Sequence, residues 1–303
     1  MMKIKIILAT LILSMSLQAK SIKVLLITGH TSSKYHSWKT KSNYCKAILD
    51  HQGIFDTDVV TMKDDTALDK SFAPDFSKYQ VVVLNIDEVQ WSDKTKESFE
   101  KYVKAGGGVV VVHETDNAFP EWKAFNLMTG LGGWAGRNES CGPYFYWKNG
   151  NYVRDTVPGN GGKHGQRVPF VINVRDSIHP ITKGMPTKWL HQNDELYGDL
   201  RGPAENMVVL ATAFSDAKTG GTGKEEPVLM VISYGKGRIF HSVLGHVTDE
   251  YADGLQDVGF QVTFSRGTEW AATGKVKQKV PTEFPTQTSV LLYDLEQLKI
   301  KKQ

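Results

Sequence analysis

Two predicted strands in the first half of the chain contain unbroken runs of hydrophobic residues. The segment Tyr79 to Asn85 contains three valines and a leucine in a row, and Val109 to Val112 is four valines between a glycine cluster and a polar segment. A strand with one face in water alternates hydrophobic and polar residues, so unbroken runs indicate strands that are covered on both faces. Such strands are typical of parallel sheets, and the pattern predicts one here.

Helical periodicity appears between the predicted strands. Ser92 to Ala105 has its hydrophobic residues on one side and Ser92 as an N-cap, and a second helix is predicted over Thr40 to His51. The alternation of strands and helices with short connections predicts an α/β, flavodoxin-like fold, which is a three-layer α/β/α sandwich with a mostly parallel sheet. The other strands predicted in this half are Ile22 to Gly29 and Phe55 to Val60.

The second half of the chain begins with a long segment that has no regular pattern. Ala118 to Gly165 is rich in glycine and aromatic residues, and a loop of this length is usually functional or disordered. Its aromatic content argues against disorder. A last helix is predicted near Gly259 to Ala272, which gives one domain over about residues 20–275 and a C-terminal tail, residues 276–303. Four further strands are predicted, at Val168 to Val174, Met207 to Ala213, Val228 to Ser233 and Ile239 to Val243.

The first 19 residues resemble a signal peptide. Lys3 and Lys5 precede a hydrophobic run from Ile6 to about Leu17, and the small residue Ala19 precedes the expected cleavage site. No other window approaches the roughly 18 consecutive hydrophobic residues of a membrane span. We therefore expect a secreted or periplasmic protein with no membrane span after cleavage of the signal peptide. The two cysteines, Cys45 and Cys141, are far apart in sequence, and we expect two unpaired thiols.

Composition excludes some partners and favours others. The formal net charge of +3 over 303 residues gives no reason to expect a nucleic-acid partner. Gly29 to Lys34 lacks the glycine-lysine-Ser/Thr ending of a phosphate loop, and the sequence predicts no nucleotide cofactor. Seven tryptophans and eleven tyrosines suit a protein that stacks sugar rings, although aromatic residues also build hydrophobic cores.

Four histidines follow predicted strands or lie in adjacent loops: His36, His113, His191 and His246. Ligands bind at the carboxyl ends of the strands in open parallel sheets, where these points converge. Gathered imidazoles with a carboxylate can bind zinc or a similar divalent ion, or can act as general acids and bases. The alternative for each histidine is a hydrogen bond in a turn or in the core.

The adjacent carboxylates of Asp194 and Glu195 are the next candidates. Neighbouring side chains in a strand point to opposite faces, so we expect at most one of the two to enter a pocket. A glycosidase ordinarily uses two carboxylates that flank the bond, and the spacing offers no persuasive second acid. No Gly-x-Ser-x-Gly motif and no cysteine at the end of the valine strand supply a nucleophile.

A set of motifs covers nearly the whole predicted domain: YHSW (35–38), GGGVVVVHETDNAFPEW (106–122), GLGGWAGRNESCGPYFYW (130–147), KHG (163–165), HPITKGMP (179–186), WLHQNDELY (189–197), LRGPAENMVVLATAFSD (200–216), YGKGRIFHSVLGH (234–246) and RGTEWAATGKV (266–276). Together these motifs resemble the trehalose-utilisation, ThuA-like family, which is similar in fold to class I glutamine amidotransferases. In those enzymes the turn after the third strand carries a nucleophilic cysteine, whereas this chain has His113 there. Glutaminase chemistry needs a thiolate, so the resemblance implies that this chain is not a glutamine amidotransferase.

The chain departs from the family pattern at three places. A small residue is usual where Glu114 stands, and the pattern has another polar residue where His30 stands. The turn from Val247 to Asp257 is longer than usual. The resemblance implies a small carbohydrate substrate, such as a glycoside or a 3-keto-glycoside, and a hydrolase or lyase, with an oxidoreductase of the same pathway as a possible partner. The alternative is a non-catalytic sugar-binding or sensing module.

Site roles are assigned on this basis. We predict that a divalent metal binds at the imidazoles of His36, His113 and His246, because three separate strand ends each supply one. We predict that Glu195 does the acid/base work, with Asp194 and His191 orienting it. Five residues are predicted to contact the substrate: Asn117, Trp134, Arg137, Tyr144 and His164.

Overall fold

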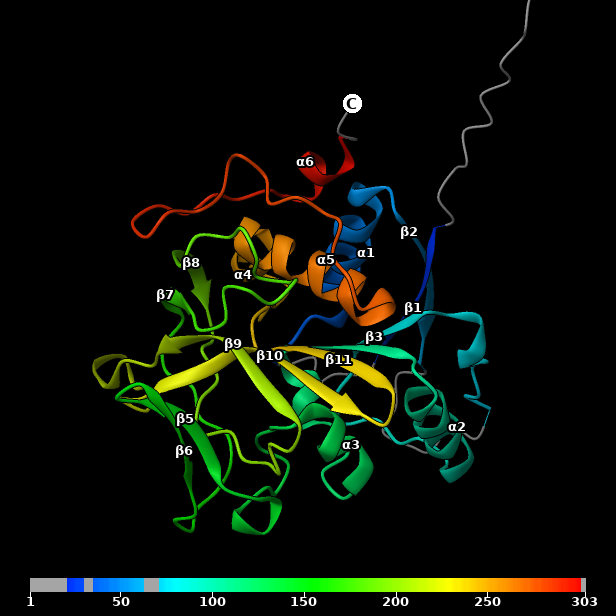
Figure 1. The fold of residues 1–303 in the computed structure, drawn as a ribbon, viewed down its shortest axis with the longest axis horizontal. Coiled ribbons are helices and arrows are strands. Elements are labelled where there is room, and N and C mark those ends of the chain that lie inside the picture. The colour runs from blue at the N-terminus through cyan, green and yellow to red at the C-terminus, as the bar shows by residue number, and fades with distance from the viewer. Residues whose placement is uncertain (1–20, 30–34, 63–70, 301–303) are drawn as a thin grey trace, which may run out of the picture.

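The computed structural model describes residues 21–29, 35–62 and 71–300, so the predicted signal peptide lies outside the described residues. The described strands form one eleven-stranded sheet, in which nine strands follow the order β2-β1-β3-β4-β11-β10-β9-β7-β8 and the β5–β6 hairpin joins at β10 (Figure 1). The strands are β1 (Ile22–Thr28), β2 (Phe55–Thr61), β3 (Val81–Asn85), β4 (Gly108–Val112), β5 (Tyr144–Lys148), β6 (Asn151–Asp155), β7 (Val168–Val174), β8 (Lys188–Asp194), β9 (Met207–Phe214), β10 (Glu225–Tyr234) and β11 (Gly237–Ser242).

The sheet is mixed and has a parallel core. Strands β2, β1, β3, β4 and β11 pair in parallel, whereas β10, β9, β7 and β8 pair antiparallel. The valine run of β4 is buried along its whole length between β3 and β11, as its unbroken hydrophobic pattern predicts. The predicted α/β fold is confirmed, and the antiparallel strands extend its parallel core.

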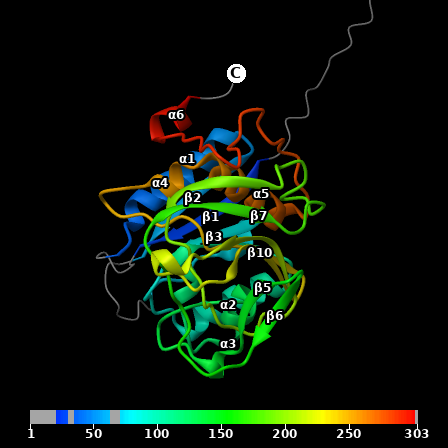
Figure 2. The same cartoon turned by 90° about the vertical axis from the view of Figure 1, so that its left-hand side faces the viewer.

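Helices cover both faces of the sheet. On one face lie α1 (Trp38–Gln52), α4 (Asp253–Gln256) and α5 (Val258–Thr273), and on the other lie α2 (Asp93–Lys104) and α3 (Lys123–Thr129) (Figures 1 and 2). Ser92 caps α2 by accepting a hydrogen bond from the Thr95 amide, as predicted. The three-layer arrangement is therefore confirmed.

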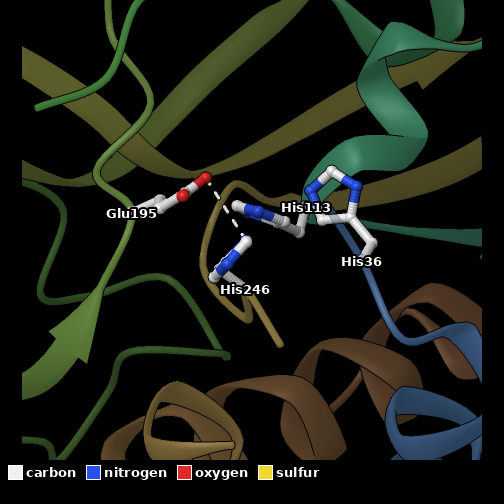
Figure 3. Close-up of side chains that lie close together, drawn as sticks. All are labelled: His36, His113, Glu195 and His246. Atoms are coloured by element: carbon white, nitrogen blue, oxygen red, sulfur yellow. Dashed lines mark ion pairs between the residues drawn. The ribbon is translucent and has the colours of Figure 1, made fainter. Parts of the chain in front are cut away.

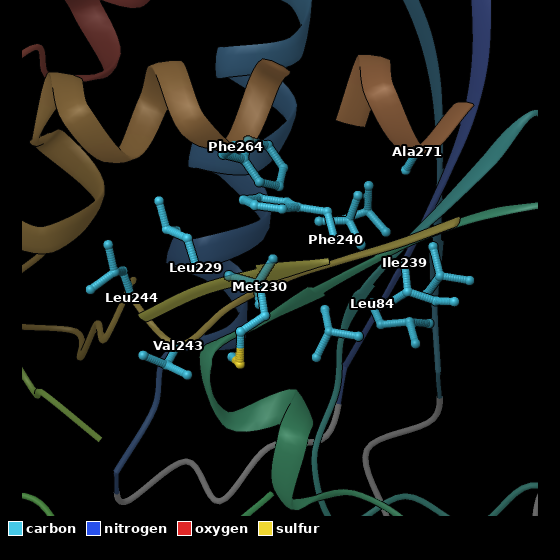
Figure 4. Packing of buried hydrophobic residues seen from close by; sticks show 14 of the residues in the cluster. Leu84, Leu229, Met230, Ile239, Phe240, Val243, Leu244, Phe264 and Ala271 are labelled. Carbon is cyan, nitrogen blue, oxygen red and sulfur yellow. The ribbon is translucent and has the colours of Figure 1, made fainter. Parts of the chain in front are cut away.

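The main hydrophobic core lies between the sheet and α5. Phe240 of β11 packs against Phe264 of α5, beside Leu229 and Ile239 (Figure 4). At Gly267 the helix backbone comes so close to the sheet that an added Cβ would lie 2.1 Å from the Phe240 ring. This close approach requires glycine and holds α5 against β4 and β11.

The segment from Ala118 to Gly165, predicted as a long loop, contains the short helix α3 and the β5–β6 hairpin. Strand β8 was also not predicted. Cys45 is buried in α1, Cys141 is partly exposed in this segment, and the two thiols are not bonded to each other. Among the described residues, no helix is both long enough and apolar enough to span a membrane.

The tail beyond residue 275 packs along the domain. The Thr286 carbonyl accepts a hydrogen bond from the Leu190 amide of β8 (2.7 Å), and the Leu291 carbonyl accepts one from the Val258 amide of α5 (2.9 Å). The terminal helix α6 (Leu295–Lys299) lies against α1. The tail therefore contacts elements that carry or support the site described below.

Candidate metal centre

Four side chains from separate segments meet at the carboxyl end of the parallel strands. His36 precedes α1, His113 follows β4, His246 follows β11, and Glu195 follows β8 (Figure 3). One potential ligand atom from each lies within 4.8 Å of those of the other three. The ring centroids of the three histidines are 5.2–5.3 Å apart. The predicted convergence of these three histidines is present in the structure, and such a cluster could bind a metal ion.

His113 stands at a sharp turn where β4 ends and a short 3₁₀ helix, His113–Asn117, begins. Its φ of 49° is in the left-handed region, which is unfavourable for a residue with a side chain and persists where the surroundings enforce it. Its Nδ1 lies 2.7 Å from the Val243 carbonyl, which can only accept, so Nδ1 carries the proton. Nε2 therefore carries the lone pair, and it is buried without a hydrogen-bond partner.

The carboxylate of Asp194 holds the two backbone segments that carry Glu195 and His246. Its Oδ1 accepts hydrogen bonds from the amides of His246 (2.9 Å) and Glu195 (2.8 Å), and its Oδ2 accepts one from the Gly245 amide (2.8 Å). The Glu195 side chain instead enters the cluster, where Oε2 lies 3.3 Å from His246 Nδ1. One of the two adjacent carboxylates thus enters the site and the other holds backbone, as the sequence predicts.

His191 does not lie at a strand end. It is buried within β8, where its Nε2 is 2.8 Å from Asp194 Oδ2 and its Nδ1 is 3.2 Å from Asp257 Oδ1. Burial opposes a charge on this imidazole, but Asp257 and Asp194 outweigh burial and raise the pKa of His191 to about 10. His191 is therefore a buried cation between two carboxylates, and it orients Asp194 from outside the cluster.

Burial controls the protonation of the cluster itself. It lowers the pKa of His36, lowers that of His113 well below the usual value, and lowers that of His246 to about 3. Burial also raises the pKa of the Glu195 carboxyl, against the opposing effect of His164. At neutral pH the three imidazoles are neutral, which is the form that binds metal ions.

An aromatic wall made of Tyr197, Trp134 and His164 borders the cluster. The Tyr197 ring stacks on His113 with centroids 4.1 Å apart, and its hydroxyl lies 3.3 Å from His36 Nε2. The ring centroids of Trp134 and Tyr197 are 4.5 Å apart, and those of His164 and Trp134 are 6.0 Å apart. His164 is exposed, and its Nδ1 is 3.8 Å from Glu195 Oε1, which places it at the rim. Tyr197 was not predicted, and its two-residue spacing from Glu195 was the only signal for it.

Three of the residues that are predicted to contact the substrate, Asn117, Arg137 and Tyr144, make contacts that hold the glycine-rich segment together. Arg137 is 1% exposed, and its guanidinium donates to the carbonyls of Asn117, Gly133 and Ala118 at 2.7–3.0 Å. The Asn117 amide, oriented to satisfy both of its polar atoms, donates to Asp116 and Gly133. These contacts give Arg137 and Asn117 a structural role in the loop, and their predicted contact with the substrate stays a prediction.

Tyr144 has different neighbours from the cluster. Its ring lies under the Arg201 guanidinium at 3.5 Å, and its hydroxyl donates to the Asn160 carbonyl at 2.8 Å. The Asn160 carbonyl belongs to the glycine-rich segment, and Arg201 pairs with Tyr144 through an isolated bridge outside the named strands. Tyr144 therefore anchors this segment, and no contact joins it to the histidines or to Glu195 in the described part of the chain.

The fold and the site together define an α/β protein with a histidine at the turn where β4 ends. The family model described as ThuA, trehalose utilisation, matches residues 23–271. The chain therefore belongs to the ThuA family. No curated protein matches it.

Solved structures agree with this assignment. A ThuA-like protein from Parabacteroides merdae is 47% identical, with a TM-score of 0.88, and the match covers 94% of this chain and all of the other. A ThuA-like protein from Bacteroides uniformis is 16% identical, with a TM-score of 0.52, and the match covers 86% of this chain and 94% of the other. The second likeness bears on the fold alone.

Proposed function

We propose that His36, His113 and His246 bind a divalent metal ion of the zinc class. The observation that carries this proposal is the Nε2 atom of His113, a buried lone pair that faces the cluster without a partner. Zinc binds histidine nitrogen at about 2.0–2.1 Å, so the ligand atoms of a tetrahedral site lie roughly 3.3 Å apart. The potential ligand atoms of the three histidines and Glu195 lie within 4.8 Å of one another, so the imidazoles would have to move closer together to bind the ion.

The proposed activity is cleavage of a glycoside or a 3-keto-glycoside by a hydrolase or lyase. Membership of the trehalose-utilisation family and the aromatic wall of Trp134 and Tyr197 support a carbohydrate ligand. When bound, the metal supplies a Lewis acid that polarises a sugar carbonyl. This chemistry suits a 3-keto sugar, whose carbonyl acidifies the neighbouring C2 proton.

Glu195 is the group placed to move that proton. Its carboxylate would accept the C2 proton, the electron pair of the broken C–H bond would form the C1–C2 double bond, and the C1–O bond would break. The proton would then pass from Glu195 to the departing oxygen. Burial, which raises the pKa of Glu195, favours this exchange near neutral pH. One carboxylate suffices for this elimination, so the proposal does not need the pair of carboxylates that a glycosidase uses.

We also propose that the protein is exported and acts beside an oxidoreductase. The sequence pattern of residues 1–19 supports export. A 3-keto-glycoside arises by two-electron oxidation of a glycoside hydroxyl, and an enzyme that carries out that oxidation would supply the substrate.

Metal content tests the site. The chain is purified without chelator, and its bound metal is compared with that of His113→Ala, His246→Ala and a control, His51→Gln, in which a histidine of α1 outside the cluster is replaced. We expect about one equivalent of metal in the wild type and the control, and little in the two cluster variants. Equal metal content in all four proteins would contradict the metal site.

Turnover tests the activity. The protein is incubated with glycosides and with their 3-keto derivatives, with and without added divalent metal. Release of the leaving group from a 3-keto-glycoside, dependent on metal, would support the proposal, and an unsaturated product would identify elimination. Binding without product would instead favour a sugar-binding or sensing module.

A further inference from the structure

A buried ion pair joins the segments that follow His36 and His113. Lys41 Nζ contacts Glu114 Oε2, and neither side chain has any exposed surface. Every other ion pair between a Lys or Arg and an Asp or Glu in the described residues has partly exposed partners. Burying two charges costs several kcal/mol per ion in desolvation, and a hydrophobic pair of similar volume is often at least as stable. The free energy of unfolding alone therefore does not explain why the chain has this buried ion pair.

The pair is built into the two segments that supply metal ligands. Glu114 directly follows His113. Lys41 lies in the first turn of α1, the helix that begins after His36 and the N-cap Ser37. The Lys41 amide donates to the Ser37 carbonyl at 3.0 Å, which continues the helix from the residue next to His36. The second carboxylate oxygen of Glu114, Oε1, is buried without a hydrogen-bond partner. Glu114 thus has one oxygen that Lys41 does not engage.

We infer that the buried charges of Lys41 and Glu114 set the affinity of the cluster for a cation. Lys41 weakens that affinity, and Glu114 strengthens it. The inference rests on the proposed metal site and extends it to two residues that are not among the proposed ligands. A positive charge buried next to the segments that hold His36 and His113 repels a metal ion bound there in a medium of low dielectric, and a carboxylate paired with that charge offsets the repulsion.

A purely mechanical role is the competing explanation. The pair would then tie α1 to the turn at His113, and removing either partner would loosen both histidines. Both single variants would lose stability and both would bind metal more weakly. The electrostatic role predicts the same loss of stability but opposite changes in metal affinity, so the sign of the change separates the two explanations.

The test uses Lys41→Met, Glu114→Gln and the double variant, with Co²⁺ as the probe. Metal-free full-length protein is titrated, and affinity is read from the visible absorption of bound Co²⁺, with thermal midpoints measured in parallel. We expect Glu114→Gln to weaken binding about 10- to 100-fold, which is the usual loss for residues that surround metal ligands. We expect Lys41→Met to tighten binding on the order of 10-fold, because it removes a charge that repels the metal ion. The double variant should bind within about threefold of the wild type, and both single variants should melt earlier.

Each outcome decides a different point. Weaker binding in both single variants, or unchanged binding in both, would overturn the inference while leaving the metal site intact. Absence of Co²⁺ binding in the wild type, matched by His113→Ala, would overturn the proposed metal site and this inference with it. If Lys41→Met does not fold, Lys41→Gln replaces it, because its amide can still donate to Glu114 while the charge is removed; it too should tighten binding.

Discussion

The parallel and antiparallel halves of the sheet contribute different parts of the site. The parallel half ends in three imidazoles, each placed by a buried strand or by the helix that follows one. The antiparallel half contributes Glu195, which follows β8, and its support, Asp194 at the end of β8 and His191 within it. The parallel half therefore supplies groups that could bind a cation, and the antiparallel half supplies the carboxylate that would react beside it. Variants that affect one half and leave the other intact test this division.

The largest expected effect is that of Glu195→Gln on turnover. Loss of a general base lowers activity by about 10²- to 10⁴-fold. Metal content should stay close to that of the wild type, because the three histidines of the parallel half remain. The measurements are turnover of a 3-keto-glycoside and bound metal in the same preparation. Loss of metal together with activity would show that Glu195 is a ligand, and the two halves would then not be separable.

Asp194→Asn should lower the free energy of unfolding, because it removes the support of Glu195 in the antiparallel half of the sheet. The substitution removes a charge that faces the buried His191 cation and weakens the hold on the amides of Gly245 and His246. Breaking a buried pair in this way costs about 3–5 kcal/mol of unfolding free energy. Asp199→Asn is the matched control, because its pair with Lys224 is partly exposed and should cost less than about 1 kcal/mol. Denaturant unfolding measures both, and equal losses would contradict the assignment.

The pH dependence of stability should report on His191. Its pKa is raised to about 10 in the folded state, so its contribution is complete below the unfolded value of about 6.5 and is lost as pH rises toward 10. The loss between pH 6.5 and 10 should be about 4 kcal/mol. Unfolding curves from pH 6.5 to 10 for the wild type and His191→Gln measure it. A slope that is the same in both proteins would exclude His191 as its source.

The smallest expected effect is that of Trp134→Ala on carbohydrate binding. Trp134 packs against Tyr197 at the edge of the cluster, and loss of a stacking surface costs about 1 kcal/mol, or roughly fivefold in affinity. Metal content should not change. Tyr152→Ala, which removes an aromatic ring from the β5–β6 hairpin, is the control and should leave affinity unchanged. Equal weakening in both variants would place the carbohydrate elsewhere.

The parallel half was largely predictable from the sequence. Unbroken hydrophobic runs identify β3 and β4, and the rule that ligands meet the carboxyl ends of parallel strands brings His36, His113 and His246 together. Sequence spacing does not encode the left-handed backbone of His113, or which nitrogen faces the cluster. These features depend on the Val243 carbonyl, which belongs to a distant segment.

The antiparallel half was harder to predict because its buried positions are not hydrophobic throughout. In β8 the inward residues include His191 and Asp194, which satisfy each other, and a strand of this kind lacks the usual alternation. The β5–β6 hairpin has a recognisable signal in Asn149-Gly150, whose φ angles of 51° and 86° suit a two-residue turn. The surrounding glycines and aromatic residues obscure it. Arg137 shows a further limit, since sequence alone does not separate a buried loop anchor from a ligand contact.

The hydrogen bond from Leu190 to the tail bears on self-association. Strand β8 is the last strand of the sheet, and an edge strand offers unpaired backbone groups to which another chain can add. The Thr286 carbonyl takes up the Leu190 amide, and Phe284 packs against the neighbouring Trp189. The tail lies beyond the stretch that the family model matches, so this chain covers the edge with a segment outside its family core. Shortening it would leave a template for intermolecular strand addition next to the residues that support Glu195.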